Sequence, residues 1–341
     1  MIPSTCLKSV TALLTLGAVT LTASAQSPFQ FPTANHALYE AGNELRFFTP
    51  TSPDRSWTTG SFGCVRTDGW QMHEGCDIRS LQHDRHGEPT DPVLATADGT
   101  VMYVSTKAAL SNYGKYIVIR HIIDGIEIYS LYAHLSEVNP GIAAGKTVHA
   151  GDPIAIMGRT SNTSEHIGKE RAHVHFELNL FDNENFSNWF RKFRPGERND
   201  HGIWNGQNLT GIDPREVFLA ERAGNFNLAT YIRSQTELCR VQVRATSFSY
   251  LKRYATLVLK NPVADREGVA GYDISLNYNG VAFALMPRAA SELAKGSSRV
   301  SLLSVNEAEY RAHPCRKFVT QRGSHWQLTE KGQKEVESLI Y

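Results

Sequence analysis

The stretch WQMHEGCDIRS, residues 70–80, places a histidine and an aspartate four positions apart, at His73 and Asp77. Imidazole nitrogen and carboxylate oxygen are both zinc ligands, and a catalytic zinc generally takes three protein ligands and keeps one position open. A second stretch, RAHVHFEL, carries His173 and His175 two positions apart in a β-like run. Side chains at i and i+2 of a strand point to the same face. The two stretches therefore predict a metal site if the fold brings them together.

Other residues near these motifs can each be interpreted as functional or as structural. His134 closes the run YSLYAHL, and His121 closes YIVIRH. A single histidine at the end of a strand is more often a surface or hydrogen-bonded residue than a catalyst. Glu177 shares the face of His175 by strand parity, so it either supports that side chain or is a packed or solvated glutamate. The stretch HDRH, residues 83–86, mimics a metal motif but lies in a polar loop, and we interpret it as solvated.

The elements that must position these residues are short β-like runs between residues 56 and 180. The runs YGKYIVIRHI and IEIYSLYAHL flank Asp124-Gly125, a strong hairpin signal because both residues tolerate positive φ. Short, closely spaced strands of this kind predict a compact antiparallel β domain. Residues 181–211 break the pattern with aromatic residues, arginines and asparagines, and long irregular segments are often functional. Pro214 is placed to begin a helix.

Residues 220–341 predict a second unit of mixed α+β character. LATYIRSQTELCRVQV, residues 228–243, has helical spacing, and DISLNYNGVAFALM predicts a hairpin around Asn279-Gly280. LTEKGQKEVESLI, residues 328–340, predicts a closing amphipathic helix. His313 and His325 stand alone, without a ligand cluster. We interpret this unit as an accessory or packing domain without a catalytic role.

The first 25 residues have the order of a secretory signal: one charge at Lys8, an apolar stretch of about a dozen residues, and Ala-Ser-Ala before Gln26. This stretch is too short for a membrane span, and no later segment has the apolar length for one. The mature chain is therefore expected to be exported, either periplasmic or secreted. Residues 26–55, rich in Pro, Asn and Thr, are expected to be an N-terminal extension. The chain has 35 basic and 34 acidic residues. It therefore lacks the excess of positive charge that would indicate binding to nucleic acid.

Export would remove Cys6 and leave four cysteines, Cys64, Cys76, Cys239 and Cys315. An even number in an oxidising compartment favours disulfides. Three pairings are open. The simplest joins Cys64 to Cys76 and Cys239 to Cys315, because each bridge then stays within one predicted domain. On an extended backbone the side chain of Cys76 points away from Asp77, which favours the disulfide over a metal–thiolate role.

The order of the motifs resembles the lysostaphin-type (LytM-like) zinc endopeptidases, which cut peptidoglycan peptides. The resemblance covers residues 56–218 and is carried, in order, by TTGSFGCVRTDGWQMHEGCDI, DPVLATADGTVMYV, NYGKYIVIRH, YAHLS, AAGKTVHAGDPIAIMGRT, HVHFE and IDP. It implies a mainly β domain of antiparallel, duplicated-hybrid type at residues 56–219. It also implies that His73, Asp77 and His175 hold one zinc ion per chain, and that His134 and His173 are catalytic histidines outside the metal.

The function implied by this resemblance is hydrolysis of the peptide stems or cross-bridges of bacterial peptidoglycan by a zinc-activated water, with His134 and His173 sharing proton transfer and oxyanion stabilisation. Two alternatives stay open. One is a non-catalytic protein that binds cell wall or activates another hydrolase; such relatives typically lack ligands that this chain has. The other is a general secreted protease. The chain departs from the family's short form at residues 161–172 and 181–211, and both segments are expected to rim the cleft.

Overall fold

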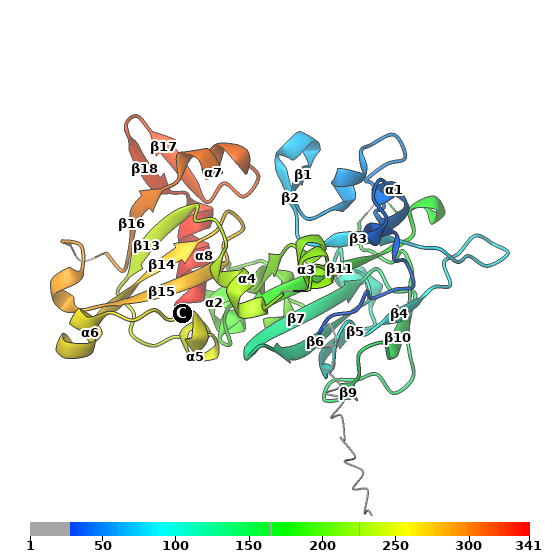
Figure 1. Ribbon diagram of the computed structural model, residues 1–341, viewed down its shortest axis with the longest axis horizontal. Coiled ribbons are helices and arrows are strands. Elements are labelled where there is room, and N and C mark those ends of the chain that lie inside the picture. The colour runs from blue at the N-terminus through cyan, green and yellow to red at the C-terminus, as the bar shows by residue number, and fades with distance from the viewer. Residues whose placement is uncertain (1–27, 164–165, 225, 297) are drawn as a thin grey trace, which may run out of the picture.

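The computed structural model describes residues 28–163, 166–224, 226–296 and 298–341 (Figure 1), so the predicted secretory signal lies outside the described residues. Within them, all pairings between named strands are antiparallel, as predicted for the region up to residue 219. The blue-to-green part of the chain and the yellow-to-red C-terminal part lie side by side. No helix in the described ranges has the length and apolar character needed to cross a membrane.

A seven-stranded sheet forms the middle of the chain. Its strand order is β12-β11-β7-β6-β5-β9, and β3 pairs with the part of β11 that β12 leaves free. The hairpin between β6 and β7 turns at Asp124 and Gly125, whose φ angles of 51° and 74° are the positive values predicted there. The seven strands are β3 (Cys76–Arg79), β5 (Gly99–Ser105), β6 (Tyr116–Ile123), β7 (Ile126–Ala133), β9 (Thr147–Val148), β11 (His173–Phe181) and β12 (Leu209–Ile212).

Two smaller sheets accompany the large one. A two-stranded ribbon joins β1 (Gly63–Arg66) to β2 (Gln71–His73), and in Figure 1 it stands at the side of the sheet toward the C-terminal part. A three-stranded sheet has the order β4-β10-β8. Its strands are β4 (Pro92–Leu94), β8 (Glu137–Val138) and β10 (Pro153–Ile156).

Helices are short and lie around the sheets. In the N-terminal extension α1 (Glu44–Phe47) is a single turn, and α2 (Phe186–Phe193) lies within the aromatic segment 181–211. Helix α3 (Pro214–Arg222) begins at Pro214 as predicted, and the Asp213 carboxylate accepts from the N–H groups of residues 215 and 216. This side-chain cap satisfies amides that would otherwise lack an acceptor in the first helical turn.

The C-terminal part contains a four-stranded sheet of order β15-β14-β13-β16 and the hairpin β17-β18. The strands are β13 (Cys239–Val243), β14 (Gly271–Leu276), β15 (Ala282–Arg288), β16 (Val300–Val305), β17 (Val319–Arg322) and β18 (His325–Leu328). The helices are α4 (Leu228–Arg233), α5 (Ser249–Arg253), α6 (Pro262–Glu267), α7 (Glu307–Ala312) and α8 (Glu330–Leu339). The predicted hairpin around Asn279-Gly280 and the closing helix are confirmed.

The helical prediction for residues 228–243 is wrong in its second half. Helix α4 ends at Arg233, and residues 239–243 form β13. This strand lies between β14 and β16, so its backbone groups are paired on both edges. Cross-strand pairing and the burial of Cys239, Val241 and Val243 outweigh the local helical spacing, because strand formation depends on the neighbouring strands.

The largest of three hydrophobic clusters extends from the N-terminal extension to the C-terminal part of the described residues. It includes Phe31 and Phe48 from the N-terminal extension, Phe176 from β11, and Ile274 and Val336 from the C-terminal part. Hydrogen bonds also cross between the parts: the Tyr254 hydroxyl accepts from the Phe181 amide at 2.8 Å, and Asn183 Nδ2 donates to the Ser338 carbonyl at 2.8 Å. The domain limits at residues 55/56 and 219/220 stay predictions.

The disulfide joins Cys64 to Cys315, which are 251 residues apart in sequence. Cys76 and Cys239 are buried free thiols. The predicted pairing of Cys64 with Cys76 and of Cys239 with Cys315 is therefore wrong. Cys76 packs into the core from β3, whereas Cys64 lies on the β1–β2 ribbon beside the C-terminal part, where its Cα is 5.3 Å from that of Cys315. The bridge fastens the ribbon to the C-terminal part.

Candidate metal centre

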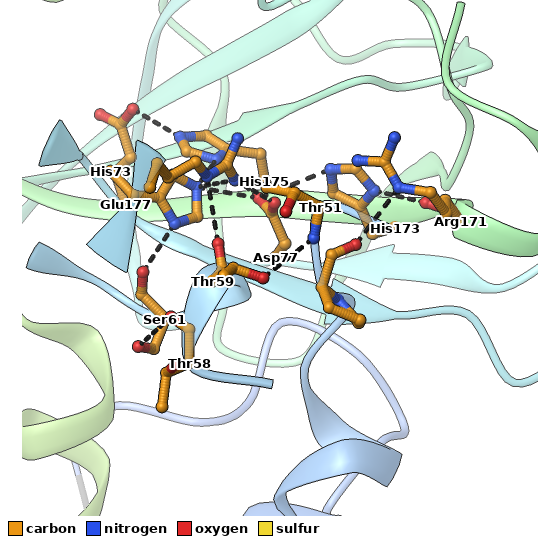
Figure 2. Close-up of polar contacts among 12 residues, drawn as sticks. Thr51, Thr58, Thr59, Ser61, His73, Asp77, Arg171, His173, His175 and Glu177 are labelled. Carbon is orange, nitrogen blue, oxygen red and sulfur yellow. Dashed lines mark hydrogen bonds and ion pairs between the residues drawn. The ribbon is translucent and has the colours of Figure 1, made fainter. Parts of the chain in front are cut away.

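The side chains of His73, Asp77 and His175 converge at one point, as Figure 2 shows. Asp77 Oδ1 lies 2.9 Å from His175 Nδ1 and 3.1 Å from His73 Nε2, and the two nitrogens are 3.1 Å apart. All three side chains are buried. Within the described ranges, these three form the single group of three or more His, Cys, Asp or Glu side chains that could hold a metal ion.

The strand register explains this convergence. Asp77 of β3 lies directly opposite His175 of β11, and His73 ends β2 just before the chain enters β3. The backbone between them passes very close to β11, because a Cβ atom on Gly75 would lie 2.3 Å from the Phe176 carbonyl oxygen. A glycine is therefore required between the two ligands.

Hydrogen bonds on the outer side of the cluster orient its imidazoles. His73 Nδ1 donates to the Ser61 carbonyl at 2.7 Å, which leaves Nε2 directed at the cluster. His175 Nε2 lies 2.8 Å from Glu177 Oε1. Of the two interpretations given for Glu177, the structure therefore shows that it supports His175. Tyr113 and Asn179 in turn donate to the Glu177 carboxylate. A carboxylate behind a ligating histidine is the usual support of a metal site.

The electrostatics of the cluster suit a cation. Burial alone would lower the pKa of His175, but Asp77 and Glu177 outweigh it and raise that pKa to about 10. Burial alone would raise the pKa of Asp77, but His173, His73 and Arg66 hold it well below its ordinary range. The site thus holds a proton between two carboxylates, where a divalent cation can replace it. The donor set and its spacing fit zinc.

Arg66 is a member of this site that was not singled out from the sequence, although it stands in the quoted stretch SFGCVR. Its Nη2 donates to Asp77 Oδ2 at 2.5 Å and to His73 Nε2 at 2.8 Å. The cation comes from β1, whose Gly63 pairs with His73. In the sequence it is part of the motif that carries the resemblance, and the ribbon geometry shows its contact with the cluster.

His134 and His173 lie beside the cluster, with their ring centroids 4.9 Å apart. His173 Nδ1 donates to the Arg171 carbonyl at 2.6 Å, and His134 Nδ1 donates to the Thr160 carbonyl at 2.8 Å. Each ring therefore keeps Nε2 for another partner, and His173 Nε2 is 3.5 Å from Asp77 Oδ1. Burial lowers the pKa of both histidines, and for His134 the neighbouring His173 and His175 lower it further.

His134 also has an unusual backbone conformation, with φ at 62°. A residue other than glycine in this left-handed region is uncommon and is held there by its surroundings. The His134 amide donates to the Tyr113 carbonyl at 2.9 Å, and its carbonyl accepts from the Thr160 amide. The turn after β7 thereby directs this imidazole toward His173. His121 is different: it is buried and bonded to Ser130 and the Asp98 carbonyl, away from the cluster.

A cavity of about 950 Å³ contains the cluster and both of these histidines. Its lining includes Ser161 and Ile167 from the loop 161–172, and Trp189 and His201 from the segment 181–211. The two segments in which the chain departs from the family's short form therefore line the cavity, as predicted. The C-terminal part forms a further wall, which the sequence did not predict. The HDRH residues, 83–86, do not line this cavity.

Comparison with known proteins supports the resemblance. Residues 71–188 match the model of peptidase family M23. None of the curated proteins compared with the chain matches it. A zinc-containing peptidase from Vibrio cholerae is 27% identical over 31% of this chain and 26% of its own, with a TM-score of 0.23. The chain thus spans about a quarter of that protein's length.

Two further solved structures are similar. The catalytic domain of lysostaphin from Staphylococcus simulans is 24% identical over 35% of this chain and 74% of its own, with a TM-score of 0.25. A putative glycyl-glycine endopeptidase LytM from Ruminococcus gnavus is 30% identical over 32% of this chain and 39% of its own, with a TM-score of 0.25. The family match contains all five histidine and aspartate residues of the site. Residues 71–188 of this chain are thus similar to peptidase family M23.

Proposed function

We propose that this chain is an exported zinc endopeptidase that hydrolyses peptide stems or cross-bridges of bacterial peptidoglycan. One observation carries the proposal: a His73–Asp77–His175 cluster lies in the same cavity as two histidines that are not part of the cluster. When bound, zinc would supply a Lewis acid that polarises a carbonyl and makes water nucleophilic near neutral pH. The family match over residues 71–188 supports the choice of peptide bonds and of peptidoglycan.

The two further histidines have the geometry for proton transfer. Because each donates Nδ1–H to a backbone carbonyl, its Nε2 carries a lone pair. One neutral imidazole can accept the proton of the attacking water and later give it to the leaving amine. The other can hydrogen-bond the oxyanion that forms at the scissile carbonyl. Glu177 and Ser61 keep the metal-binding imidazoles oriented throughout.

Export is supported by two features. The first 25 residues have the composition of a secretory signal. The Cys64–Cys315 disulfide is of a kind that persists in oxidising compartments. A non-catalytic wall-binding role is disfavoured because such a role needs neither the three ligands nor the two neighbouring histidines. A general secreted protease would use the same centre, so the substrate must be tested directly.

The test is mass spectrometry of fragments released from purified peptidoglycans with different cross-links. We expect the zinc-loaded chain to release peptides with new amino and carboxyl termini, and the chelator-treated chain and the His134→Ala variant to release few or none. Full zinc occupancy without release from any peptidoglycan would overturn the proposal. Comparable cleavage of an unfolded protein such as casein would favour the general protease.

A further inference from the structure

Five cationic side chains line the cavity from residue 181 onward: Arg194, Arg198, Arg316, Lys331 and Lys334. Arg198 is paired with Asp200 and Lys334 with Glu330, both at 2.9 Å or less. The wall considered below is formed by the other three. Arg194 follows α2, Arg316 follows the bridged Cys315, and Lys331 lies in the first turn of α8. Arg316 Nη2 donates to Glu335 Oε2 at 2.9 Å. Among the described residues, the ion-pair partner of Arg194 is Glu197, at 3.4 Å. The positive charges on this wall are therefore only partly compensated.

Lys331 is the least satisfied of the three. Its ammonium makes no hydrogen bond within the described ranges, and its single ion-pair contact there is Glu335 Oε1 at 3.9 Å. The side chain is 49% exposed, so half of it is removed from water. Burial lowers the pKa of this lysine, and Arg316 lowers it further. A cation in the first turn of a helix is also disfavoured by the helix dipole. Glu335 and Glu74 act in the opposite direction on the pKa of Lys331 but do not outweigh burial and the arginines.

The two arginines also keep unused donors. Nε of Arg194 and Nε of Arg316 are buried without a hydrogen-bond partner in the described part of the chain. Buried donors normally have an acceptor, and these two have none within the described residues. Asp182 also lines the wall, but burial raises its pKa to about 7, so near neutrality it carries only part of a negative charge.

The disulfide holds this wall in place relative to the metal cluster. Arg316 directly follows Cys315, which is bonded to Cys64 of β1. The residue before Cys64, Gly63, is the strand partner of His73. The disulfide and one strand pairing therefore connect Arg316 to a metal-binding histidine. The bridge thus restrains the position of this wall relative to the metal cluster.

We propose that Lys331, together with Arg316 and Arg194, binds a carboxylate of the substrate peptide, so that the C-terminal part determines specificity. The inference rests on the proposed function. The ligand is a peptide carboxylate because the same cavity contains the metal cluster, and a molecule that occupies both places is the substrate itself. Stem peptides of peptidoglycan carry free carboxylates.

Binding measured by calorimetry tests this without requiring turnover. The probes are an uncross-linked peptidoglycan stem tetrapeptide and the same peptide with its carboxylates converted to amides. The full chain should bind the free acid about ten-fold more tightly than the amide, the usual size of a charge-assisted hydrogen bond. Lys331→Gln should remove most of that preference while zinc content and Tm stay unchanged. Lys252→Gln, at an exposed lysine of α5, should keep it.

Three results would overturn the inference: equal affinities of the full chain for the two peptides, no binding of either, or a preference that survives in Lys331→Gln. Hydrolysis of peptidoglycan is measured in a separate experiment, by mass spectrometry of the released fragments. The proposed function can therefore fail while the carboxylate preference holds, and the preference can fail while hydrolysis holds.

Discussion

Arg66 and Asp77 form an ion pair at the edge of the metal cluster. Arg66 Nη2 lies 2.5 Å from Asp77 Oδ2, whereas Oδ1 of the same carboxylate faces His73 and His175. The Asp77 side chain is 3% exposed and that of Arg66 is 23% exposed. One oxygen of Asp77 thus serves the guanidinium and the other serves the imidazoles, which fixes the plane of the carboxylate.

Removing this guanidinium should make the chain more dependent on zinc. In the metal-free chain, Arg66→Met leaves Oδ2 of the buried Asp77 carboxylate without its ion-pair partner, and we expect a loss of about 3 kcal/mol in the free energy of unfolding. Zinc supplies a positive charge at the same carboxylate, so the rise in Tm on adding zinc should be larger than in the wild type. Thermal unfolding with zinc and with chelator measures both quantities.

Arg55→Met is the matched control, because Arg55 is exposed and its partner Asp68 is exposed too. It should leave both Tm values within about 1 °C of the wild type, since exposed ion pairs contribute about 0–1 kcal/mol. An Arg66→Met chain whose metal-free Tm equals that of the wild type would show that the pair is not stabilising.

The five residues of the site should divide into two classes. His73→Ala, Asp77→Ala and His175→Ala should lose both zinc and activity, because three ligands are needed for a site with one open position. His134→Ala and His173→Ala should keep zinc near stoichiometry, while kcat falls by roughly 10²–10⁴, the scale of acid–base contributions. Zinc content and turnover of all five variants measure this. Loss of zinc from His134→Ala or His173→Ala, or near wild-type turnover of either, would contradict the assignment.

The disulfide makes a clear prediction for peptide mapping. A tryptic digest without reductant should contain one linked peptide pair with Cys64 and Cys315, and Cys76 and Cys239 should react with a thiol reagent only after unfolding, since both are buried. Cys315→Ser should lower the free energy of unfolding by about 2–4 kcal/mol. Cys239→Ser is the control and should leave the linked pair intact. Detection of a Cys64–Cys76 peptide would contradict the structure.

Acid should destabilise the chain partly through His121. Burial lowers the pKa of His121 from its ordinary 6.5 to about 4. Between these values the unfolded chain binds a proton that the folded chain does not. The contribution is therefore complete above pH 6.5 and is lost progressively toward pH 4, by up to about 3 kcal/mol.

Urea unfolding of the wild type and of His121→Gln at pH 7 and pH 4.5 measures this effect. The variant should lose less stability on acidification than the wild type. His149→Gln, at an exposed histidine, should behave like the wild type. If His121→Gln and the wild type lose the same free energy, the burial of a neutral His121 is not what makes the chain acid-sensitive.

The parts of the site that could be predicted are those set by local geometry. Strand parity places His173, His175 and Glu177 on one face of β11, and the short HEGCD stretch holds His73 close to Asp77. The meeting of Asp77 with His175 is different, because it depends on the pairing of β3 with β11. Only the resemblance to a known family predicted that register.

The two predictions that are wrong have one physical cause: residues close along the chain need not be close in space. Cys64 and Cys76 are near neighbours in sequence, yet the ribbon places Cys64 beside Cys315. The helical spacing of residues 228–243 is likewise a local signal, and pairing of β13 with two neighbouring strands overrides it. Lys331 gave no signal at all, because only the packing of α8 brings it to the cavity.

The Cys64–Cys315 bridge also determines at which stage of its synthesis the protein can complete its cavity. A ribosome adds Cys64 251 residues before Cys315, which at common rates of translation is on the order of 10–50 s. During that interval the nascent chain already has His73 and Asp77 but no partner for Cys64 and no α8. The wall that carries Lys331 is added last. Unfinished chains would therefore have an incomplete cavity, and the order of synthesis itself would delay its completion.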